Sequence, residues 1–504
     1  MTTTNRAAVA SSLLAGALLA AATAVLLILA FPKAAVAPLA AFALAPLLVT
    51  LARGRGPLEH FLLGWGAGII CWAGACYWIE DVLAVHGGMA WWAAWLGFVI
   101  FCLIKALHLG AFASGAGFLI RRPWAALTVP ALWVAIERTH GELGFAWLDL
   151  GNAGVNMSAL ARLAPFTGVY GLSFAFAMMA TAVALLVLRR RRIEVAPLAL
   201  LLLVGFVPRL PEPHRGDEVA VLVQPNIPET AEWTREWADR MYNRIEALTM
   251  KTALGAPGEA PRLIVWPEAP MPAYYDRDPV FRERVNEVAR RAGAYLILNV
   301  VPHNEKGEPY NSALLVSPAG RPLGRYDKMN LVPFGEFVPA PVKALVDKVS
   351  TEAGDFAPGR RQTLLPMDGH RVGAFVCYES VFPDFVRRFA RDGAGLLVNI
   401  SNDGWYGHSA ARDQHLEIVR MRAAENRRWI LRATNDGITS TIDPGGRVWR
   451  NLPSYVEGAA RTGYSYISDT TFYSRHGDWF VWVCVVVAAA GLAEALRRGV
   501  RGKA

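Results

Sequence analysis

Long apolar runs without charged residues constrain this chain more than any other feature of its sequence. Ser11–Phe31 carries no charge, and a helix of that length spans roughly the 30 Å of a bilayer's hydrocarbon core. Hydrophobic residues make up 54% of the chain and charged residues 18%, against about 45–50% and about 25% in globular proteins. The surplus predicts a membrane protein and excludes a disordered chain, a collagen and a disulfide scaffold.

Eight segments are predicted to span the membrane. Two of them, Trp124–Ile136 and Val195–Val207, are short for a span, which needs about 20 residues. A secretory signal peptide is the alternative for the first segment. Its apolar run exceeds the usual length and another follows at once, so we expect it to be retained. The eight segments are Ser11–Phe31, Ala34–Ala52, Phe61–Ile79, Met89 to about Gly110, Trp124–Ile136, Leu160–Leu188, Val195–Val207 and Trp479–Leu496.

Positive charges are clustered between the apolar segments. The 51 Lys and Arg exceed the 42 Asp and Glu, for a net charge of +9, but clusters after the second, fourth, sixth and eighth segments account for most of this excess. We therefore expect no nucleic-acid partner. Because such clusters stay in the cytoplasm, an even number of spans separates neighbouring clusters, which requires both short segments to cross. Both termini are then cytoplasmic, and the segment between the seventh and eighth spans is extracytoplasmic. The clusters are Arg53 and Arg55; Arg121 and Arg122; Arg189–Arg192; and Arg497, Arg498, Arg501 and Lys503.

Three regions follow from these patterns. Residues 1–213 are expected to form a membrane domain of seven helices, residues 214–476 a soluble domain, and residues 477–504 a last span with a basic tail. In the soluble domain, apolar runs alternate with segments whose apolar residues recur every three or four positions, as in a helix. These segments include Trp233–Leu254, Pro279–Ala292 and Asp413–Arg428. Strands that are almost continuously apolar are buried on both faces, which predicts an α/β domain. The expected strands lie in Val219–Asn226, Arg262–Glu268, Ala294–Val300, Asn311–Pro318, Arg371–Ser380 and Gly393–Asp403.

Polar residues end three of these strands, where α/β sheets tend to carry their chemistry. They are Glu268, Cys377 and the Asn402–Asp403 pair. A lone cysteine that closes a buried strand is more often a core residue than a nucleophile, by roughly three to one. The other four cysteines, however, lie in predicted spans: Cys71, Cys76, Cys102 and Cys484. An unpaired thiol in an oxidising compartment favours a chemical role.

A cysteine nucleophile needs a base for its proton and a cation or donor for the oxyanion that it creates. Glu268 is a candidate base, because it follows the apolar run LIVW and precedes Pro270. Lys328, in GRYDKMNLVPFGEFVP, is a candidate cation. The commoner explanations are a solvated carboxylate and a surface lysine, and sequence spacing alone does not show that the three side chains meet.

The motifs around these residues resemble those of the nitrilase, or carbon-nitrogen hydrolase, superfamily. They are WPEAP at 266–270, GRYDKMNLVPFGEFVP at 324–339, GAFVCYESVFP at 373–383, SNDGWYG at 401–407 and the segment 414–446. With seven spans before the domain and one after it, the whole chain resembles the apolipoprotein N-acyltransferase family. VQPNIPETAEW at 223–233 and PYNSALL at 309–315 are also similar to that family's sequences. The resemblance implies an αββα sandwich on a membrane domain.

The resemblance also implies roles for individual residues. Cys377 is then the nucleophile, Glu268 the general base and Lys328 the stabiliser of the oxyanion. Four supporting residues are Asn311, Glu336, Tyr378 and Glu379, and Trp233 is expected near the substrate entry. One departure is visible at 411–413, where Ala-Arg-Asp stands in place of an expected Gly-Pro before the Gln-His pair. This change concerns a local loop and not the three central residues.

The activity implied is transfer of an acyl chain from a phospholipid, through a Cys377 thioester, to the α-amine of a diacylglyceryl-cysteine that begins an apolipoprotein. The location implied is the bacterial inner membrane, with the catalytic domain in the periplasm. No cofactor is expected, and the chain is expected to be a monomer. Phe334, Phe337 and Val338, beside Glu336, suggest an apolar flap that excludes water from the thioester.

Two other functions stay open on the sequence: a membrane-tethered amidase of nitrilase type with water as acceptor, and a transporter or scaffold with an inactive enzyme domain. The spacing of His408 and His415 with Asp403 and Asp413 does not match a zinc site, so no metal is expected. Lys105 and His108 lie inside the fourth span, and either face the protein interior or a wet cavity, or snorkel to the surface.

Overall fold

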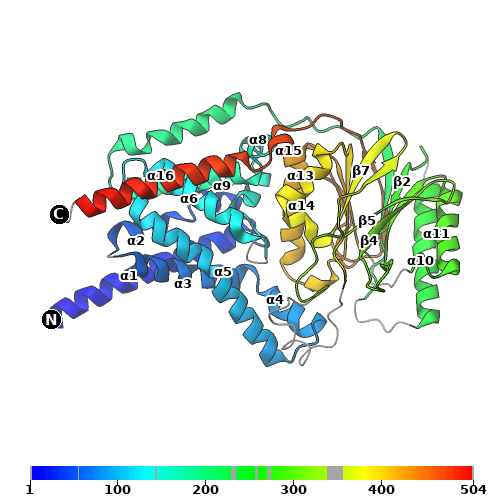
Figure 1. The fold of residues 1–504 in the computed structure, drawn as a ribbon, viewed down its shortest axis with the longest axis horizontal. Helices are drawn as coiled ribbons and strands as arrows, with labels where there is room; N and C mark the ends of the chain where they lie inside the picture. The colour runs from blue at the N-terminus through cyan, green and yellow to red at the C-terminus, as the bar shows by residue number, and fades with distance from the viewer. Residues whose placement is uncertain are drawn as a thin grey trace. The chain divides into compact units, whose positions relative to one another are not determined.

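The computed structural model describes residues 3–54, 56–141, 145–228, 234–255, 259–268, 274–337 and 356–501 (Figure 1). The chain divides into two compact units. The first, the helical unit, contains Met1–Glu80, Trp92–Leu210 and His476–Ala504. The second, the sheet unit, contains Asp81–Trp91 and Pro211–Arg475. A short segment inside the predicted membrane domain thus belongs with the sheets.

Four helices of the helical unit are long and apolar enough to cross a membrane: Ser11–Ala30 within α1, α5, α9 and Trp479–Arg498 within α16. Helix α3 passes the same test together with the following segment Trp78–His86, from which it is bent by 59°. The elements are α1 (Thr3–Ala30), η1 (Ala37–Ala41), α2 (Ala45–Arg53), α3 (Pro57–Ala75), α4 (Trp78–Asp81), α5 (Trp91–Leu119), α6 (Ala125–Glu137), η3 (Arg138–His140), η4 (Leu150–Asn156), α7 (Ser158–Ala161), α8 (Ala164–Thr167), α9 (Val169–Val187), η5 (Arg192–Phe206) and α16 (Trp479–Arg501).

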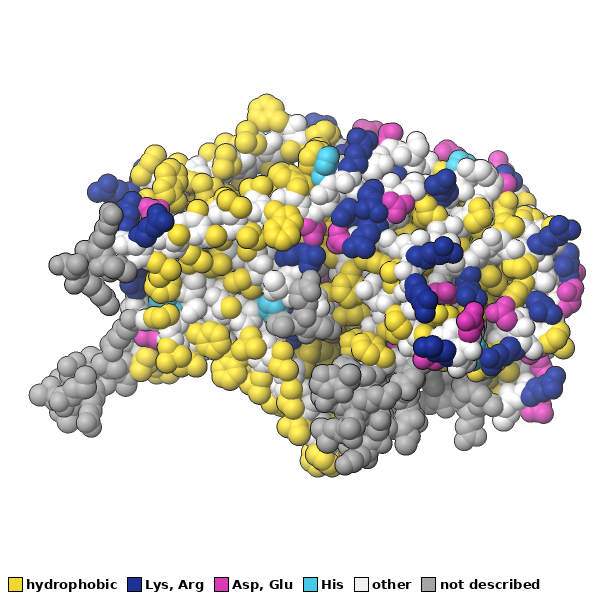
Figure 2. All heavy atoms as spheres, viewed as in Figure 1, with side chains coloured by type: hydrophobic (Ala, Val, Ile, Leu, Met, Phe, Trp, Pro, Cys, Tyr) yellow, Lys and Arg dark blue, Asp and Glu magenta, His cyan; other side chains and the backbone are white. Residues whose placement is uncertain are grey.

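Each of the eight predicted spans corresponds to helical structure, but several differ in form. The predicted span Leu160–Leu188 is continuous only from Val169, because Pro165 and Gly168 interrupt it; Gly168 has a positive φ of 64°. The short segment Trp124–Ile136 forms α6, which contacts α9 and α16. The segment Val195–Val207 lies in the 3-10 helix η5. Hydrophobic side chains cover the visible face of the helical unit (Figure 2).

Arginines from separate basic clusters meet within the helical unit. Arg121 donates to the carbonyl of Gly54, one residue beyond Arg53. Arg190 donates to the carbonyl of Arg121 at 3.1 Å, and Arg122 to the carbonyl of Ala495 at 2.8 Å, next to the C-terminal cluster. The chain therefore returns to the same end of this unit after the second, fourth, sixth and eighth predicted spans.

The sheet unit contains two six-stranded sheets, with strand orders β12-β1-β2-β3-β4-β5 and β11-β10-β9-β8-β7-β6. Strands β1, β2 and β3 are parallel, as are β7, β8 and β9. The strands are β1 (Glu218–Gln224), β2 (Leu263–Val265), β3 (Tyr295–Val300), β4 (Ser312–Val316), β5 (Pro322–Asp327), β6 (Leu364–Met367), β7 (His370–Val376), β8 (Leu396–Ser401), β9 (Ile430–Thr434), β10 (Ser440–Ile442), β11 (Val448–Asn451) and β12 (Gly458–Tyr464).

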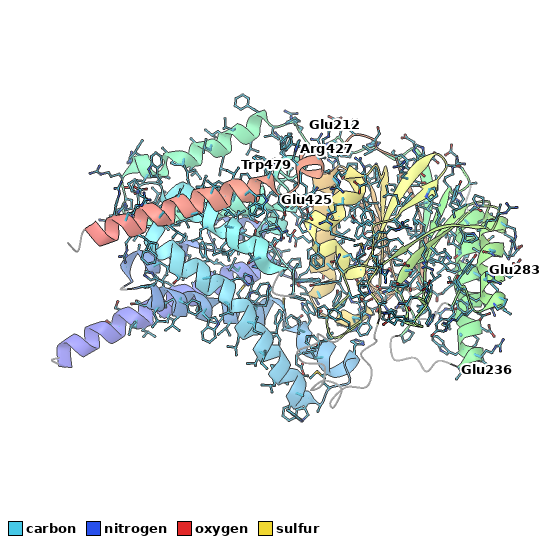
Figure 3. All side chains as sticks on the ribbon, in the orientation of Figure 1. Glu212, Glu236, Glu283, Glu425, Arg427 and Trp479 are labelled. Atoms are coloured by element: carbon cyan, nitrogen blue, oxygen red, sulfur yellow. The ribbon has the colours of Figure 1, made fainter. Side chains whose placement is uncertain are left out.

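Helices cover the outer faces of both sheets, giving the four layers of an αββα sandwich (Figure 1). Apolar residues of α10 and α11, such as Ile245 and Phe281, join the core beside the first sheet. Their charged residues Glu236 and Glu283 point away from the sheets (Figure 3), as expected for amphipathic helices. The helical elements are η2 (Val82–His86), α10 (Arg235–Leu254), α11 (Pro279–Ala292), η6 (Cys377–Val381), α13 (Pro383–Arg391), η7 (Gly404–Tyr406), α14 (Ala411–Asn426) and α15 (Phe472–His476).

The core beside β7 yields a test of this packing. Phe389 of α13 is fully buried, and its ring lies against Tyr326 and Phe385. Its Cβ packs so closely on Gly373 that a side chain at position 373 would collide with it. Replacing Phe389 with Ala is expected to cost about 3–5 kcal/mol of unfolding free energy, or a fall of roughly 10 °C in melting temperature. Thermal melts of the full chain in detergent measure this, with Val280→Ala on the exposed face of α11 as the unaffected control. Equal melting temperatures for the two variants would contradict the assignment.

Candidate active site

Three strand ends carry the side chains predicted to do chemistry. Glu268 follows β2, Lys328 directly follows β5, and Cys377 directly follows β7. The first two strands belong to one sheet and β7 to the other. All three side chains lie in the interior, since the exposed fractions of the residues are 9%, 1% and 5%. Charged groups so well buried require partners.

Lys328 is held between two carboxylates. Its Nζ lies 2.9 Å from a carboxylate oxygen of Glu336 and 3.5 Å from Oε1 of Glu268. Asn311 Nδ2 donates to Oε1 of Glu268 at 2.6 Å and to Oε1 of Glu336 at 2.7 Å. Its Oδ1 accepts from Asn299 at 2.7 Å, which fixes the amide as a donor to both carboxylates. Asn311 therefore sets the positions of the two acids around the ammonium.

The charges in this cluster shift the pKa values of Lys328 and Glu268. Burial by itself lowers the pKa of Lys328, but Glu268 and Glu336 outweigh it and hold that pKa above its usual value. Burial raises the pKa of Glu268, and the charge of Glu336 raises it further against the opposing effect of Lys328. Lys328 therefore stays a cation at neutral pH, while Glu268 is a better proton acceptor than an ordinary glutamate.

Cys377 has a backbone conformation that is unusual for its residue type. Its φ of 49° lies in the left-handed region, which costs a residue with a side chain roughly 1–2 kcal/mol. Burial raises the pKa of its thiol to about 12, the charge of Glu268 raises it as well, and Lys328 lowers it. The charges of Glu268 and Lys328 therefore act on the thiol in opposite directions. The thiol is protonated at neutral pH, so a base must remove its proton before it can attack.

Glu379 secures the turn that follows Cys377. Its Oε2 accepts from the backbone N–H of Val376 at 2.9 Å, and its Oε1 accepts from Tyr326 Oη at 2.6 Å. The same Oε1 accepts from the backbone N–H groups of Met329 and Asn330, next to Lys328. Glu379 thus connects the loop of the lysine to the loop of the cysteine. The buried ring of Tyr378 packs edge-on against Phe382, with ring centroids 5.3 Å apart.

The loop around Glu336 has two faces. Glu336 points inward, and its Oε2 accepts from the backbone N–H of Val332 at 2.8 Å. Phe334 is 39% exposed, with a φ of 64°, and its N–H donates to the carbonyl of the half-buried Phe337 at 2.8 Å. The expected flap therefore has an exposed phenyl ring two residues before Glu336. Trp233 and Val338 lie outside the described residues.

Two features of the site had no signal in the sequence patterns. The backbone N–H of Asn402 donates to Oε2 of Glu268 at 3.0 Å, and a backbone donor leaves no trace in a motif. At the departure from the family pattern, Arg412 is buried, donates to Asp436 Oδ2 at 2.8 Å and lies 4.0 Å from the ring centroid of Tyr455. Arg412 thus ties the start of α14 to the loop after β9.

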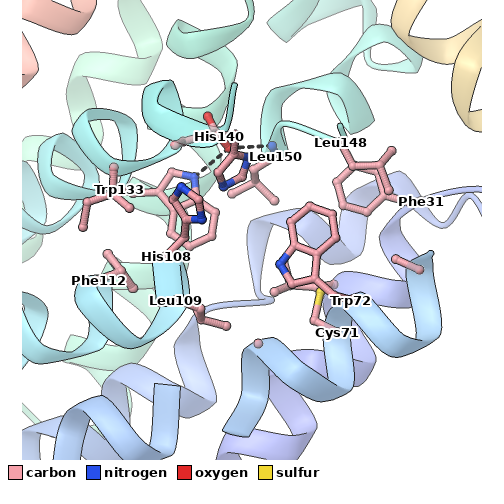
Figure 4. A pocket seen from close by; sticks show the side chains of 15 residues that line it. Phe31, Cys71, Trp72, His108, Leu109, Phe112, Trp133, His140, Leu148 and Leu150 are labelled. Carbon is pink, nitrogen blue, oxygen red and sulfur yellow. Dashed lines mark hydrogen bonds between the residues drawn. The ribbon is translucent and has the colours of Figure 1, made fainter. Parts of the chain in front are cut away.

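A cavity of about 60 Å³ lies inside the helical unit (Figure 4). His108 and His140 line it, with ring centroids 4.5 Å apart. Lys105 is 1% exposed and donates to the carbonyls of His140 and Phe145 at 3.3 and 2.8 Å, so it faces the interior and does not snorkel. Among the described residues, no group of three or more His, Cys, Asp or Glu side chains could hold a metal ion.

The pKa of Cys377 yields a test of the site's electrostatics. Iodoacetamide reacts with the thiolate, so with a pKa of about 12 the alkylation rate of Cys377 should rise about tenfold per pH unit from pH 7 to 10. Because the charge of Glu268 raises this pKa, the change Glu268→Gln should increase the rate at each pH. Peptide mass spectrometry separates Cys377 from the other cysteines. An alkylation rate that stops rising below pH 9, or slower alkylation of the Glu268→Gln variant, would contradict this account of the pKa of Cys377.

Two family models match separate parts of the chain. Residues 219–466 match the carbon-nitrogen hydrolase family, and residues 23–182 match the N-terminal domain of apolipoprotein N-acyltransferase. The chain is 36% identical to the apolipoprotein N-acyltransferase of Geobacter metallireducens over 498 residues, which cover 94% of each chain. It is 34% identical to that of Methylococcus capsulatus over 488 residues, 93% of each.

Among solved structures, a variant of the Nesterenkonia AN1 amidase from the nitrilase superfamily matches with 18% identity and a TM-score of 0.40, covering 53% of this chain and 96% of its own. The two relatives, by contrast, match nearly the whole chain. At 36% identity over almost its full length, this chain belongs to the apolipoprotein N-acyltransferase family.

Proposed function

We propose that this chain transfers an acyl chain from a phospholipid to the α-amine of the diacylglyceryl-cysteine at the N-terminus of an apolipoprotein. The observation that carries the proposal is the buried cluster of Lys328 with Glu268 and Glu336, close enough to Cys377 for its charges to act on the thiol. Membership of the family supplies the class of donor and acceptor.

In the first half-reaction, Glu268 takes the proton of the Cys377 thiol, and the sulfur attacks the ester carbonyl of the phospholipid. Lys328 and a backbone N–H stabilise the oxyanion of the tetrahedral intermediate. When the intermediate collapses, the C–O bond breaks and the leaving alkoxide receives the proton from Glu268. The products are a Cys377 thioester and a lysophospholipid.

In the second half-reaction, the free α-amine of the lipoprotein attacks the thioester carbonyl and Glu268 accepts a proton from the nitrogen. The C–S bond breaks, an amide forms, and the thiolate regains a proton. Because a thiolate leaves more readily than an alkoxide and the amide is more stable than the thioester, transfer to nitrogen is favourable. A shared covalent intermediate predicts ping-pong kinetics.

We infer that the helical unit crosses the inner membrane eight times, with the sheet unit in the periplasm and both termini in the cytoplasm. The meeting of separate basic clusters in the helical unit supports this topology, because such clusters remain on the cytoplasmic side. The seventh crossing rests on the placement of the basic clusters, because η5 includes Arg192 and Glu194 among its 15 residues and its apolar part is short for a span.

An assay with both substrates tests the proposed function. The purified chain is incubated with phospholipid vesicles and a diacylglyceryl lipopeptide, and the peptide mass is measured. We expect a gain of one acyl chain with the wild-type protein and none with Cys377→Ala, since no thioester can form. No gain with a folded wild-type protein would exclude the transferase. Release of free fatty acid without N-acylation would instead favour a hydrolase of nitrilase type.

The exposed Phe334 yields a second test. If Phe334 and Phe337 exclude water from the thioester, the double change Phe334→Ser and Phe337→Ser should speed thioester hydrolysis by about tenfold, roughly 1.4 kcal/mol of barrier, and lower the yield of N-acylated peptide. Quenched samples of the acyl-enzyme, without acceptor, give the hydrolysis rate. Leu323→Ser, at an exposed position in β5, is the control. Unchanged hydrolysis and unchanged transfer would rule out the flap.

A further inference from the structure

A sealed polar network lies directly behind the nucleophile turn. His415, on α14, has its Nε2 2.8 Å from Ser380 Oγ and 3.2 Å from the carbonyl oxygen of Cys377. Its Nδ1 lies 3.1 Å from Oδ1 of Asp403. The exposed fractions of His415, Ser380 and Asp403 are all zero. The imidazole therefore bridges the end of β8 and the turn that Cys377 begins.

The order of serine, histidine and aspartate matches a hydrolase triad, but the burial argues against that chemistry. Ser380 Oγ is enclosed in the interior, so no substrate carbonyl can reach it. The residue that is both reactive and next to the charged cluster is Cys377. The network is therefore placed to act on Cys377 and does not supply a second nucleophile.

Asp403 is a fixed anchor for His415. Arg432 Nη2 donates to both carboxylate oxygens of Asp403, at 2.9 and 2.7 Å, and Ser401 Oγ donates to Oδ1 at 3.0 Å. Burial would raise the pKa of Asp403, but Arg432 outweighs it and holds the carboxyl ionised. Gly437 packs so closely that an added Cβ would lie 2.2 Å from Oδ2. The carboxylate has no room to move, and it holds Arg432 Nη2, which lies 3.2 Å from His415 Nδ1. Burial lowers the pKa of His415, so the neutral ring carries a single proton. With Nδ1 accepting from Arg432, that proton lies on Nε2, where it is donated to the turn.

The contact with the Cys377 carbonyl has a consequence for the next residue. A trans peptide is planar, so its C=O and N–H point in opposite directions. When His415 fixes the carbonyl of Cys377, it also fixes the N–H of Tyr378, directed away from the imidazole. Cys377 has a φ of 49°, a conformation that persists only when its surroundings enforce it. His415 contacts the carbonyl of Cys377, and Glu379 accepts from the N–H of Val376, so both side chains hold this turn.

We propose that His415, anchored by Asp403 and Arg432, is a positioning residue that orients the Cys377–Tyr378 peptide so that its N–H donates to the oxyanion. This inference rests on the proposed function in one respect, because it takes acyl transfer as the reaction at Cys377. It assigns the orientation of that peptide to a side chain that never touches substrate.

Two substitutions of His415 separate this role from simple packing. Asn places its Oδ1 near the position of Nδ1, where it can accept from Arg432, but it ends short of the turn, whereas Gln places an amide at the position of Nε2, with both a donor and an acceptor. Loss of one oriented oxyanion donor lowers acyl-transfer rates by about 10²–10³. Alkylation of the thiol by iodoacetamide creates no oxyanion and so does not need the donor.

We would measure acylation of Cys377 by p-nitrophenyl butyrate and by phospholipid, alkylation by iodoacetamide, and melting temperature, all on the full chain. We expect His415→Asn to slow acylation about 100-fold with alkylation changed less than about threefold, and His415→Gln to recover acylation to within about tenfold of wild type. His370→Asn, on the exposed start of β7, is the matched control.

Equal losses of acylation and alkylation in His415→Asn would overturn the proposal, because the whole turn would then have moved. Unchanged acylation in that variant would overturn it too, as would a Gln variant no faster than the Asn variant. If His415→Asn does not fold, Ser380→Ala in the same assays should slow acylation more than alkylation, and equal effects there would count against the proposal. Wild-type protein that reacts with the nitrophenyl ester but not with phospholipid would refute the proposed function and leave the positioning test intact.

Discussion

A lysine ammonium buried between two glutamates is the interaction on which the rest of the site depends. Removing a charge from water costs several kcal/mol unless partners compensate, and Lys328 is 1% exposed. Glu268 and Glu336 compensate it, but the cluster then holds one more negative than positive charge. Burial raises the pKa of Glu268, and the charge of Glu336 adds to this rise while Lys328 opposes it, which makes Glu268 a better proton acceptor than an ordinary glutamate. The same arrangement thus stabilises the interior and prepares the proton transfer.

The two halves of the site come from different sheets, so the fold assembles it only when the sheets pack together. Glu268 and Lys328 end strands of one sheet, while Cys377 ends a strand of the other. The carboxylate of Glu379 joins the loops of the two sheets by accepting from both backbones. Core packing and reactivity are therefore linked, and damage to the interface between the sheets should be visible in the chemistry.

Sequence reasoning selected Cys377, Glu268 and Lys328 because strand ends and local motifs carry a readable pattern. It did not find the backbone N–H of Asn402 that donates to Glu268, because a main-chain group is present in almost every residue and so leaves no pattern in the sequence. It weighed His415 only as a metal ligand and rejected that role, since its partners come from three distant segments and no spacing relates them. In the helical unit, hydropathy located apolar helical segments but not the break at Gly168 or the 3-10 geometry of η5, which depend on backbone conformation.

The central claim is that the thiol of Cys377 carries the acyl chain, and trapping the acyl-enzyme tests it most directly. Purified protein is incubated with phospholipid alone, denatured in acid and examined by intact and peptide mass spectrometry. The predicted result is a mass increase of one acyl chain on the peptide that contains Cys377, removed by neutral hydroxylamine as a thioester should be. An unmodified Cys377 peptide, or an acyl group on another residue, would contradict the mechanism.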